Sequence, residues 1–280
     1  MVQPTEAVRH ILSLSGGKDS AALAIYLRDS VPEMEYIFND TGKELPETYE
    51  YLERLQDYLR KPIVRTTDRL GLEKLGFDHW YHVYGEMIPS GYRRWCTKML
   101  KLKPFEQYVG SDTVYNYIGL RADEGRKGYI SRKPNIIPVY PFCDDGLVLA
   151  DIERILRDSG IGMPTYTKWG RTRSGCYFCF FQQKIEWVRL KQSHPDLFEE
   201  AKKYERVYEK TGNFFTWSEG ESLQELERPE RMEQIVREAE RQKTFEAQNR
   251  ENLTLFEVFS EMYGPKEEAE DEQACFICKI

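Results

Sequence analysis

The first half of the chain contains short apolar runs separated by longer segments. In one of these segments, apolar and aromatic residues recur at helical spacing. The helical segment covers residues 46–59 and begins with a proline, which is favoured in the first turn of a helix. The apolar runs, which are typical of short buried strands, lie at residues 11–14, 36–38, 63–64 and 114–118. Strands separated by helices predict an α/β fold with a mainly parallel twisted sheet and helices on both faces.

The second half of the chain has a helical pattern. The expected helices cover residues 151–159, 183–209, 222–226 and 229–249. The chain then ends in an acidic stretch, which predicts a flexible tether because such a composition cannot form a packed core. We therefore expect an α/β nucleotide-binding domain at residues 1–165, a helical region at residues 166–262 and a cysteine-containing tail at residues 263–280.

A glycine-rich turn joins the first predicted strand to the first helix. The strand runs into Ser15-Gly16-Gly17-Lys18-Asp19-Ser20, and helix-forming residues follow. The glycines let the backbone approach an anion, the helix N-terminus supplies free N–H donors, and Lys18 adds a positive charge. The spacing differs from the Walker motif, which has four residues between its first glycine and its Gly-Lys pair. The turn predicts a phosphate-binding loop, and an ordinary strand-to-helix turn is the alternative.

Two further polar segments follow predicted strands. Residues 40–44 follow the second strand, and residues 119–127 follow the fourth. Ligands of parallel sheets bind beyond the carboxyl ends of the strands. We therefore expect both segments and the loop at residues 15–20 to form one site.

The composition favours a cytoplasmic protein that does not contact a membrane. The chain has 280 residues and a net charge of −7, and no apolar stretch approaches the roughly 18 residues that a membrane span needs. The N-terminus has no charged-then-apolar signal pattern. Six cysteines in such a protein favour metal or redox chemistry over structural disulfides.

Basic residues are grouped along the sequence, although the chain is acidic overall. Such grouping can produce one positive face on an acidic protein, and solvated surface charges are the alternative. The groups are Arg93, Arg94, Lys98, Lys101 and Lys103; Arg126, Lys127, Arg132 and Lys133; and Lys168, Arg171 and Arg173.

Taken in chain order, these segments and a later cysteine pair resemble the PAPS reductase-like family, which includes N-type ATP pyrophosphatases. The matching segments are residues 15–20, Asp40-Thr41-Gly42 with Pro46-Glu47-Thr48, Gly119-Leu120-Arg121-Ala122-Asp123-Glu124 and Gly175-Cys176-Tyr177-Phe178-Cys179. The resemblance covers about residues 8–220 and implies an adenine nucleotide alpha hydrolase-like fold. It also implies that residues 15–20 bind the β,γ-phosphates of ATP and that pyrophosphate is released.

The resemblance implies roles for other residues of the predicted site. Asp40 and Thr41 would line the nucleotide pocket, together with Gly119. Arg121 would clamp phosphate oxygens, because a guanidinium suits bidentate contact. Either Asp19 or Asp40 could hold Mg²⁺, which prefers oxygen ligands.

Simpler roles remain open for two of these side chains. Asp40 could cap the turn that follows its strand. Arg121 could form a surface ion pair with Asp123 or Glu124.

The spacing of the cysteines predicts a metal centre. Cys176 and Cys179 form a chelating Cys-x-x-Cys pair, and iron–sulfur APS reductases have such a pair preceded by a tandem Cys-Cys. Cys96 matches the second member of that tandem, while Trp95 replaces the first. A [4Fe–4S] cluster needs four thiolates, and Cys143 is the leading candidate for the fourth, with the two tail cysteines as others. Zinc accepts a similar ligand set and is the alternative, as is simple burial of the thiols.

Two departures distinguish the chain from sulfonucleotide reductases. Those enzymes usually lack the loop lysine and end in Glu-Cys-Gly-Leu-His, whereas this chain keeps Lys18 and has Cys275-Phe276-Ile277-Cys278. Lys18 would neutralise the β,γ-phosphates of ATP. Residues 94–104 and the Gly-Cys-x-x-Cys motif most resemble the DndC/SspD-type ATP pyrophosphatases of DNA phosphorothioation. That resemblance implies adenylation of a DNA backbone phosphate, followed by displacement of AMP by sulfur.

On this interpretation the basic groups face the DNA backbone, and a cysteine desulfurase and other sulfur-modification proteins are partners. The catalytic residues would be Lys18, Asp19 and Arg121, with Cys275 and Cys278. The two cysteines would carry sulfur as a persulfide or resolve it as a disulfide. A PAPS or APS reductase and a non-catalytic nucleotide sensor are the alternative functions.

Overall fold

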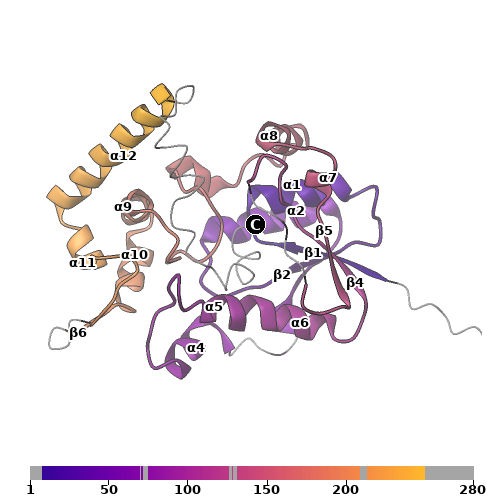
Figure 1. Cartoon of the computed structure of the whole chain (residues 1–280), viewed down its shortest axis with the longest axis horizontal. Helices are drawn as coiled ribbons and strands as arrows, with labels where there is room; N and C mark the ends of the chain where they lie inside the picture. Colours follow the sequence, from indigo (N-terminus) through magenta and orange to yellow (C-terminus); the bar gives the residue numbers. More distant parts are fainter. Residues whose placement is uncertain are drawn as a thin grey trace, which may run out of the picture. The chain divides into compact units, whose positions relative to one another are not determined.

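The computed structural model describes residues 8–69, 71, 75–125, 128, 131–208 and 213–249. The chain divides into two compact units between Tyr177 and Phe178. The pattern of the sequence places the corresponding boundary at residue 165. The two units are described separately below (Figure 1).

A five-stranded parallel sheet forms the centre of the first unit (Figure 1). Its strand order is β3-β2-β1-β4-β5. The strands are β1 (Arg9–Leu14), β2 (Glu35–Phe38), β3 (Ile63–Arg65), β4 (Val114–Tyr117) and β5 (Ile136–Val139). The chain leaves β1 toward β2 on one side, and β4 pairs with β1 on the other side. This arrangement creates a switch point between β1 and β4, where ligands of doubly wound sheets bind.

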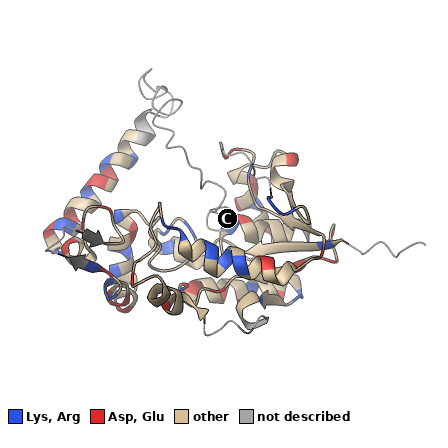
Figure 2. Cartoon of the chain, turned by 60° about the horizontal axis from the view of Figure 1, so that its bottom comes forward, with Lys and Arg blue, Asp and Glu red and all other residues tan. Residues whose placement is uncertain are grey.

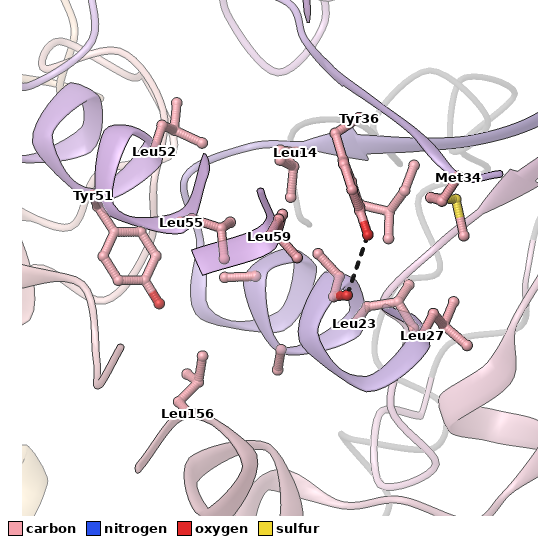
Figure 3. Close-up of a cluster of buried hydrophobic side chains, with 14 of the residues drawn as sticks. Leu14, Leu23, Leu27, Met34, Tyr36, Tyr51, Leu52, Leu55, Leu59 and Leu156 are labelled. Atoms are coloured by element: carbon pink, nitrogen blue, oxygen red, sulfur yellow. Dashed lines mark hydrogen bonds between the residues drawn. The ribbon is translucent and has the colours of Figure 1, made fainter. Parts of the chain in front are cut away.

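One face of the sheet is covered by α1 (Lys18–Leu27), α2 (Pro46–Leu59) and α8 (Leu149–Asp158) (Figure 1). Side chains alternate across a strand, so Leu12 and Leu14 of β1 point to this face. Figure 3 shows leucines of α1 and α2 in this cluster together with Tyr36, whose hydroxyl donates a hydrogen bond of 3.5 Å to the carbonyl of Ala24.

The opposite face is covered by α6 (Lys103–Val109). Phe105 and Val109 of this helix pack against Ile11 of β1 and Ile37 of β2, the residues that alternate with those of the first face. The expected parallel sheet with helices on both faces is therefore confirmed. The strand β5 was not predicted from the sequence.

The other helices of the first unit are short and lie in the connections. They are α3 (Thr66–Arg69), α4 (Phe77–Val83), α5 (Trp95–Thr97), the π-helix η2 (Lys98–Leu102), α7 (Pro141–Asp144) and the 3₁₀-helix η3 (Thr165–Trp169). In the π-helix the Lys103 N–H bonds to the Lys98 carbonyl, a wider turn than that of an α-helix.

The second unit is mostly helical, as expected. It contains α9 (Lys184–Ser193), α10 (Pro195–Lys202), α11 (Leu223–Leu226) and α12 (Pro229–Asn249), with a two-stranded antiparallel sheet of β6 (Arg206–Tyr208) and β7 (Asn213–Phe215). Its core includes Trp187, Phe198 and Trp217, which are all buried.

The prediction of a single helix at residues 183–209 is wrong, because these residues form α9, α10 and β6. Pro195 lacks an N–H and starts a new helix as the first residue of α10. The last part of the expected helix is strand β6, because Val207 pairs with Phe214 across the sheet. Among the described residues, no helix combines the length and apolar character needed to cross a membrane.

Candidate functional site

The glycine-rich loop lies between β1 and α1, at the carboxyl end of β1. Ser20 closes the loop: the Ser15 N–H donates to Ser20 Oγ (3.2 Å), and Ser20 Oγ donates to the Gly17 carbonyl (3.2 Å). The Gly17 N–H donates to Ser15 Oγ (3.2 Å). Gly17 is the N-cap of α1 and provides no side-chain cap, so the loop directs backbone N–H donors and the positive end of the helix dipole toward the same place. This is the geometry of an anion-binding loop.

Gly16 is required by both its backbone and its surroundings. Its φ is +71°, a conformation that favours glycine. A Cβ at this position would lie 2.4 Å from Cγ2 of Thr48 in α2. Its carbonyl accepts a hydrogen bond of 3.2 Å from the buried hydroxyl of Tyr166. The loop is therefore clamped between α2 and η3.

Lys18 and Arg121 both bind the carboxylate of Asp19. Lys18 Nζ lies 2.7 Å from Asp19 Oδ2, and Arg121 Nη1 lies 2.8 Å from Asp19 Oδ1. Arg121 also pairs with Asp123 at 2.9 Å and Glu124 at 3.4 Å. Burial lowers the pKa of Arg121, but the hydrogen bond and charge of Asp19 outweigh burial and raise the pKa overall. The loop after β4 thus brings a second cation to the loop after β1, next to Lys18.

The close approach of these two loops depends on Gly119. A Cβ at this position would lie 3.0 Å from the Asp19 carbonyl oxygen. Any larger residue would push the Arg121 segment away from α1. The absence of a side chain at Gly119 is therefore part of the site.

Asp40 follows β2 and makes three polar contacts. Its Oδ1 accepts bonds of 2.8 Å from the Gly42 N–H and from the Tyr49 hydroxyl, and its Oδ2 lies 3.3 Å from Arg65. Burial, followed by the charge of Asp40, raises the pKa of Tyr49, which therefore stays a hydrogen-bond donor. By accepting the bond from the Gly42 N–H, Asp40 caps the turn after β2, which is the simpler of the two roles considered from the sequence. Binding of a nucleotide by Asp40 stays a prediction.

Thr41 links Glu44 to Cys176. Its hydroxyl donates to Glu44 Oε1 at 2.8 Å and lies 3.2 Å from Cys176 Sγ. Glu44 is buried, which raises the pKa of its carboxyl group. Glu44 and Cys176 also form a backbone bridge, and the Tyr177 N–H donates to the Lys43 carbonyl. The cysteine-containing segment is thereby attached to the loop after β2.

Arg171 organises that segment from within. Its side chain is 2 % exposed, and its guanidinium donates to the carbonyls of Arg173, Gly175 and Cys176 at 2.9, 3.2 and 2.7 Å. The same segment reaches the phosphate-binding loop, where Ser174 Oγ donates to Ser15 Oγ at 3.2 Å. The sequence grouped Arg171 with surface cations that face DNA, and this expectation is wrong because Arg171 is buried.

A small cavity lies between β1, β2 and the segment around Gly175. It has room for about 20 Å³, which fits one water molecule. Ser13 Oγ, Asn39 Nδ2 and Glu44 Oε2 are buried without a hydrogen-bond partner among the described residues, and all three residues line the cavity. Lys101 of the π-helix also lines it, so the basic segment at residues 93–103 reaches the site.

The four described cysteines of the predicted metal centre come from three separate segments of the chain. Cys96 lies in α5, and Cys143 in α7 donates to the Leu120 carbonyl at 3.1 Å. Cys176 belongs to the first unit and Cys179 to the second. Among the described residues, no group of three or more His, Cys, Asp or Glu could hold a metal ion. The ligand set of Cys96, Cys143, Cys176 and Cys179 stays a prediction, and no chemical step below depends on a cluster.

Several predicted residues lie outside the described residues. They are Arg126, Lys127, Cys275 and Cys278.

Sequence reasoning missed several residues that hold the site together. Tyr166 and Ser174 contact the loop from segments distant in sequence, and Thr48 of α2 lies against Gly16. Trp169 joins η3 to α2, because its Nε1 donates to Glu47 at 3.0 Å. Thr48 belongs to the Pro-Glu-Thr segment of the family resemblance, which was an available signal. Tyr166 and Ser174 carry no motif, because they act through contacts distant in sequence.

Comparison with known proteins gives one family match. Residues 9–136 match the model of the phosphoadenosine phosphosulfate reductase domain. This segment contains β1 to β4 and the loops that carry Lys18, Asp40 and Arg121.

Curated relatives extend over more of the chain. One uncharacterised protein of Methanocaldococcus jannaschii is 28% identical over 197 residues, which cover 66% of this chain and 45% of that protein. A second uncharacterised protein of the same organism is 26% identical over 217 residues, which cover 72% of this chain and 42% of that protein. An uncharacterised nin region protein of Escherichia phage lambda is 28% identical over 156 residues, 45% of this chain and 52% of its own. The chain thus spans about half the length of these relatives.

Two solved structures are similar to parts of the chain. A PAPS reductase from Candida auris has a TM-score of 0.48 and 14% identity, covering 61% of this chain and 82% of its own. A U34-tRNA thiolase from Methanococcus maripaludis, solved with its [4Fe–4S] cluster, has a TM-score of 0.36 and 14% identity, covering 70% of each chain. Residues 9–136 are thus similar to a phosphoadenosine phosphosulfate reductase domain.

Proposed function

We propose that the first unit cleaves ATP between its α- and β-phosphates and transfers AMP to an acceptor, which sulfur then attacks. The observation that carries this proposal is the arrangement of Lys18 and Arg121, both of which bind Asp19 beside a loop with anion-binding geometry. The family match over residues 9–136 supports nucleotide-dependent chemistry related to sulfur.

The triphosphate of ATP fits this loop. Backbone N–H groups at the start of α1 would bind the β- and γ-phosphates. Gly16 and Gly119 let α2 and the Arg121 segment pack closely against this loop. Lys18 and Arg121, which both contact Asp19, would bind the phosphate oxygens. Asp19 would then be available to Mg²⁺, which accepts carboxylate ligands next to substrate phosphates.

The proposed chemistry has two steps. In the first, an acceptor oxygen attacks the α-phosphorus, the bond to the bridging oxygen breaks, and pyrophosphate leaves with the electron pair. Lys18 would stabilise the charge that develops on the leaving group. In the second, a sulfur nucleophile attacks the activated acceptor, and AMP leaves.

We propose a DNA backbone phosphate as the acceptor, so that the product is a phosphorothioate. The grouped Lys and Arg residues of the first unit support a polyanionic acceptor. A cysteine desulfurase would supply sulfur as a persulfide on Cys275, whose outer sulfur attacks the DNA phosphorus. Attack of the Cys278 thiolate on the Cys275 sulfur would then release the phosphorothioate and form a disulfide, which a dithiol reductant must reduce.

The first experiment tests ATP cleavage at the loop. Purified protein is incubated with ATP, Mg²⁺ and DNA, and the nucleotide products are separated. Lys18→Ala should abolish AMP and pyrophosphate formation while leaving the circular dichroism spectrum unchanged. Lys203→Ala, which removes an exposed charge from the second unit, is the matched control and should behave as the wild type. Formation of ADP and phosphate would exclude this assignment.

A sulfonucleotide reductase is the second candidate function, and the family match favours it. That function predicts sulfite from PAPS or APS in the presence of reduced thioredoxin, without consumption of ATP. The products distinguish the two candidates. The ATP pyrophosphatase releases pyrophosphate from ATP and needs Lys18 to do so, whereas the reductase releases sulfite and consumes no ATP.

A further inference from the structure

Tyr92 lies at the tip of a tight turn that projects from the first unit. Ser90 and Arg93 exchange two backbone hydrogen bonds, of 3.1 and 3.3 Å, so Gly91 and Tyr92 form the tip. Tyr92 is 83 % exposed, more than any other large hydrophobic side chain among the described residues. The base of the turn is further held by Arg94, whose Nε donates to the Gly91 carbonyl at 3.1 Å.

The turn is followed directly by a buried aromatic cluster. Trp95 directly follows the turn and is buried, and its Nε1 donates to the Met87 carbonyl at 3.0 Å. Its ring stacks on Tyr84 at 5.3 Å and packs against Phe77 at 5.0 Å. An aromatic side chain exposed beside such a cluster loses little conformational entropy when it binds a partner.

The residues that follow the turn make this region positively charged. Figure 2 shows Lys and Arg gathered along the helical segment that runs from α5 into α6. Arg93, Lys98 and Lys103 are exposed, and the sequence has no Asp or Glu from Met87 to Phe105. Among the described residues, neither Arg93 nor Lys98 forms an ion pair, whereas acidic residues on the flanking segments are paired: Asp78 with Lys43, Glu86 with His82, and Glu106 with Lys133.

The same helical segment reaches the candidate site from its inner side. Lys101 lines the cavity next to Ser15 and Glu44, while Lys98 and Lys103 lie outside. The π-helical turn accommodates this distribution, because its wider spacing changes which residues share a face. The same short segment therefore carries two exposed lysines and one lysine that lines the cavity of the candidate site.

We infer that Tyr92, Arg93, Lys98 and Lys103, named here the Tyr92 surface, bind an unpaired stretch of a DNA strand. This inference rests on the proposed function, in which a DNA phosphate is the acceptor. The cations bind successive phosphates, and the exposed ring of Tyr92 stacks on a base, a contact that needs a base face open to the protein. A base pair inside a duplex presents only its edges to a side chain, so the surface selects single-stranded or locally opened DNA.

The test measures binding of fluorescently labelled DNA by anisotropy, without ATP, for a single strand and for the same sequence as a duplex. The single strand should bind more tightly than the duplex. Tyr92→Ala should weaken single-strand binding by about 5- to 150-fold, as loss of one stacked base predicts, and Tyr92→Phe should retain most of the affinity. Tyr26→Ala, which changes a partly exposed tyrosine on α1 across the sheet, is the matched control and should leave binding unchanged.

The cations are tested through the dependence on salt. Each phosphate contact contributes about 0.7 to the slope of log affinity against log salt for a single strand, so Lys98→Ala should reduce the slope by about that amount. Unchanged binding by Tyr92→Ala, tighter binding of the duplex, or tighter binding of an RNA of the same sequence would overturn the inference.

The outcome is separable from that of the proposed function. Single-strand binding is measured without ATP, and ATP cleavage is measured separately on the same preparation of the wild-type protein. If the strand binds as expected but ATP is not cleaved to AMP, only the proposed function fails. If ATP is cleaved to AMP but the strand does not bind, only the Tyr92 surface fails.

Discussion

Gly16→Ala tests whether the phosphate-binding loop is built as the structure shows. The substitution adds one carbon, which meets two separate obstacles. The φ of +71° is unfavourable for any residue with a Cβ, and the new Cβ would lie 2.4 Å from Cγ2 of Thr48. Thr48 is fully buried in α2, so its methyl group cannot move into solvent, and protein interiors are closely packed.

The two obstacles have different expected magnitudes. The left-handed backbone conformation costs about 1–2 kcal/mol for alanine. Overpacking of a buried methyl group costs about 1–3 kcal/mol. Gly16→Ala should therefore lower the free energy of unfolding by roughly 2–5 kcal/mol, unless the loop shifts, in which case the loss appears in ATP binding.

Gly146→Ala is the matched control for the backbone contribution. Gly146 has a φ of +69°, and nothing lies within 4 Å of the position that its Cβ would occupy. Its substitution should cost only the conformational part, about 1–2 kcal/mol. The difference between the two alanine variants then measures the steric overlap with Thr48.

Thr48→Ser provides the second control, because it removes Cγ2. Alone it should cost about 1 kcal/mol through the loss of a buried methyl group. Combined with Gly16→Ala, it should recover about 1–3 kcal/mol of the loss, which a double-mutant cycle measures as coupling. Urea unfolding gives the free energies, and equilibrium binding of ATP reports on the loop. Equal effects of Gly16→Ala and Gly146→Ala, together with additivity of Gly16→Ala and Thr48→Ser, would refute this account of the loop.

Four further predictions concern other parts of the chain. Burial raises the pKa of Glu205 to about 7, despite hydrogen bonds from two backbone N–H groups. The free energy of unfolding should therefore fall by about 2–4 kcal/mol as pH rises from about 4.5 to 7 and stay level above pH 7. Glu205→Gln should remove most of this pH dependence, as measured by urea unfolding. Arg171→Met should lower the free energy of unfolding by at least about 2 kcal/mol, because the carbonyls that accept from its buried guanidinium lose their donor, and unchanged stability would contradict that role. Anaerobically purified protein should be brown and Cys176→Ser colourless by absorbance, whereas colourless wild type with one zinc would favour the structural alternative. Deletion of residues 270–280 should stop sulfur incorporation into DNA but preserve AMP formation, and full sulfur transfer by the truncated protein would exclude a role for the tail.

Local signals in the sequence were sufficient for most of the sheet. Apolar runs of strand length located β1, β2, β3 and β4, and their alternation with helices predicted a parallel sheet. The strand β5 was missed because Pro138 interrupts a short run, and a proline weakens any strand pattern. The hairpin of β6 and β7 was missed because its strands are only three residues long and follow directly after a helix.

The positions of the loops after β1, β2 and β4 followed from the sequence for the same reason. Each loop directly follows its strand, and the carboxyl ends of parallel strands must share one edge of the sheet. The sequence therefore predicted that Arg121 would approach the loop of Lys18, and the ion pairs of both residues with Asp19 agree with that expectation.

The attachment of residues 171–177 to this edge was decided by the tertiary structure alone. Ser174 bonds to Ser15 across 159 residues, and Cys176 meets Thr41 across 135 residues. No short-range pattern encodes which distant segment will supply such contacts, because they depend on how the whole chain packs. The burial of Arg171 has the same origin: in the sequence it is one more basic residue beside Arg173, and only the folded loop around it provides the carbonyl groups that its guanidinium needs.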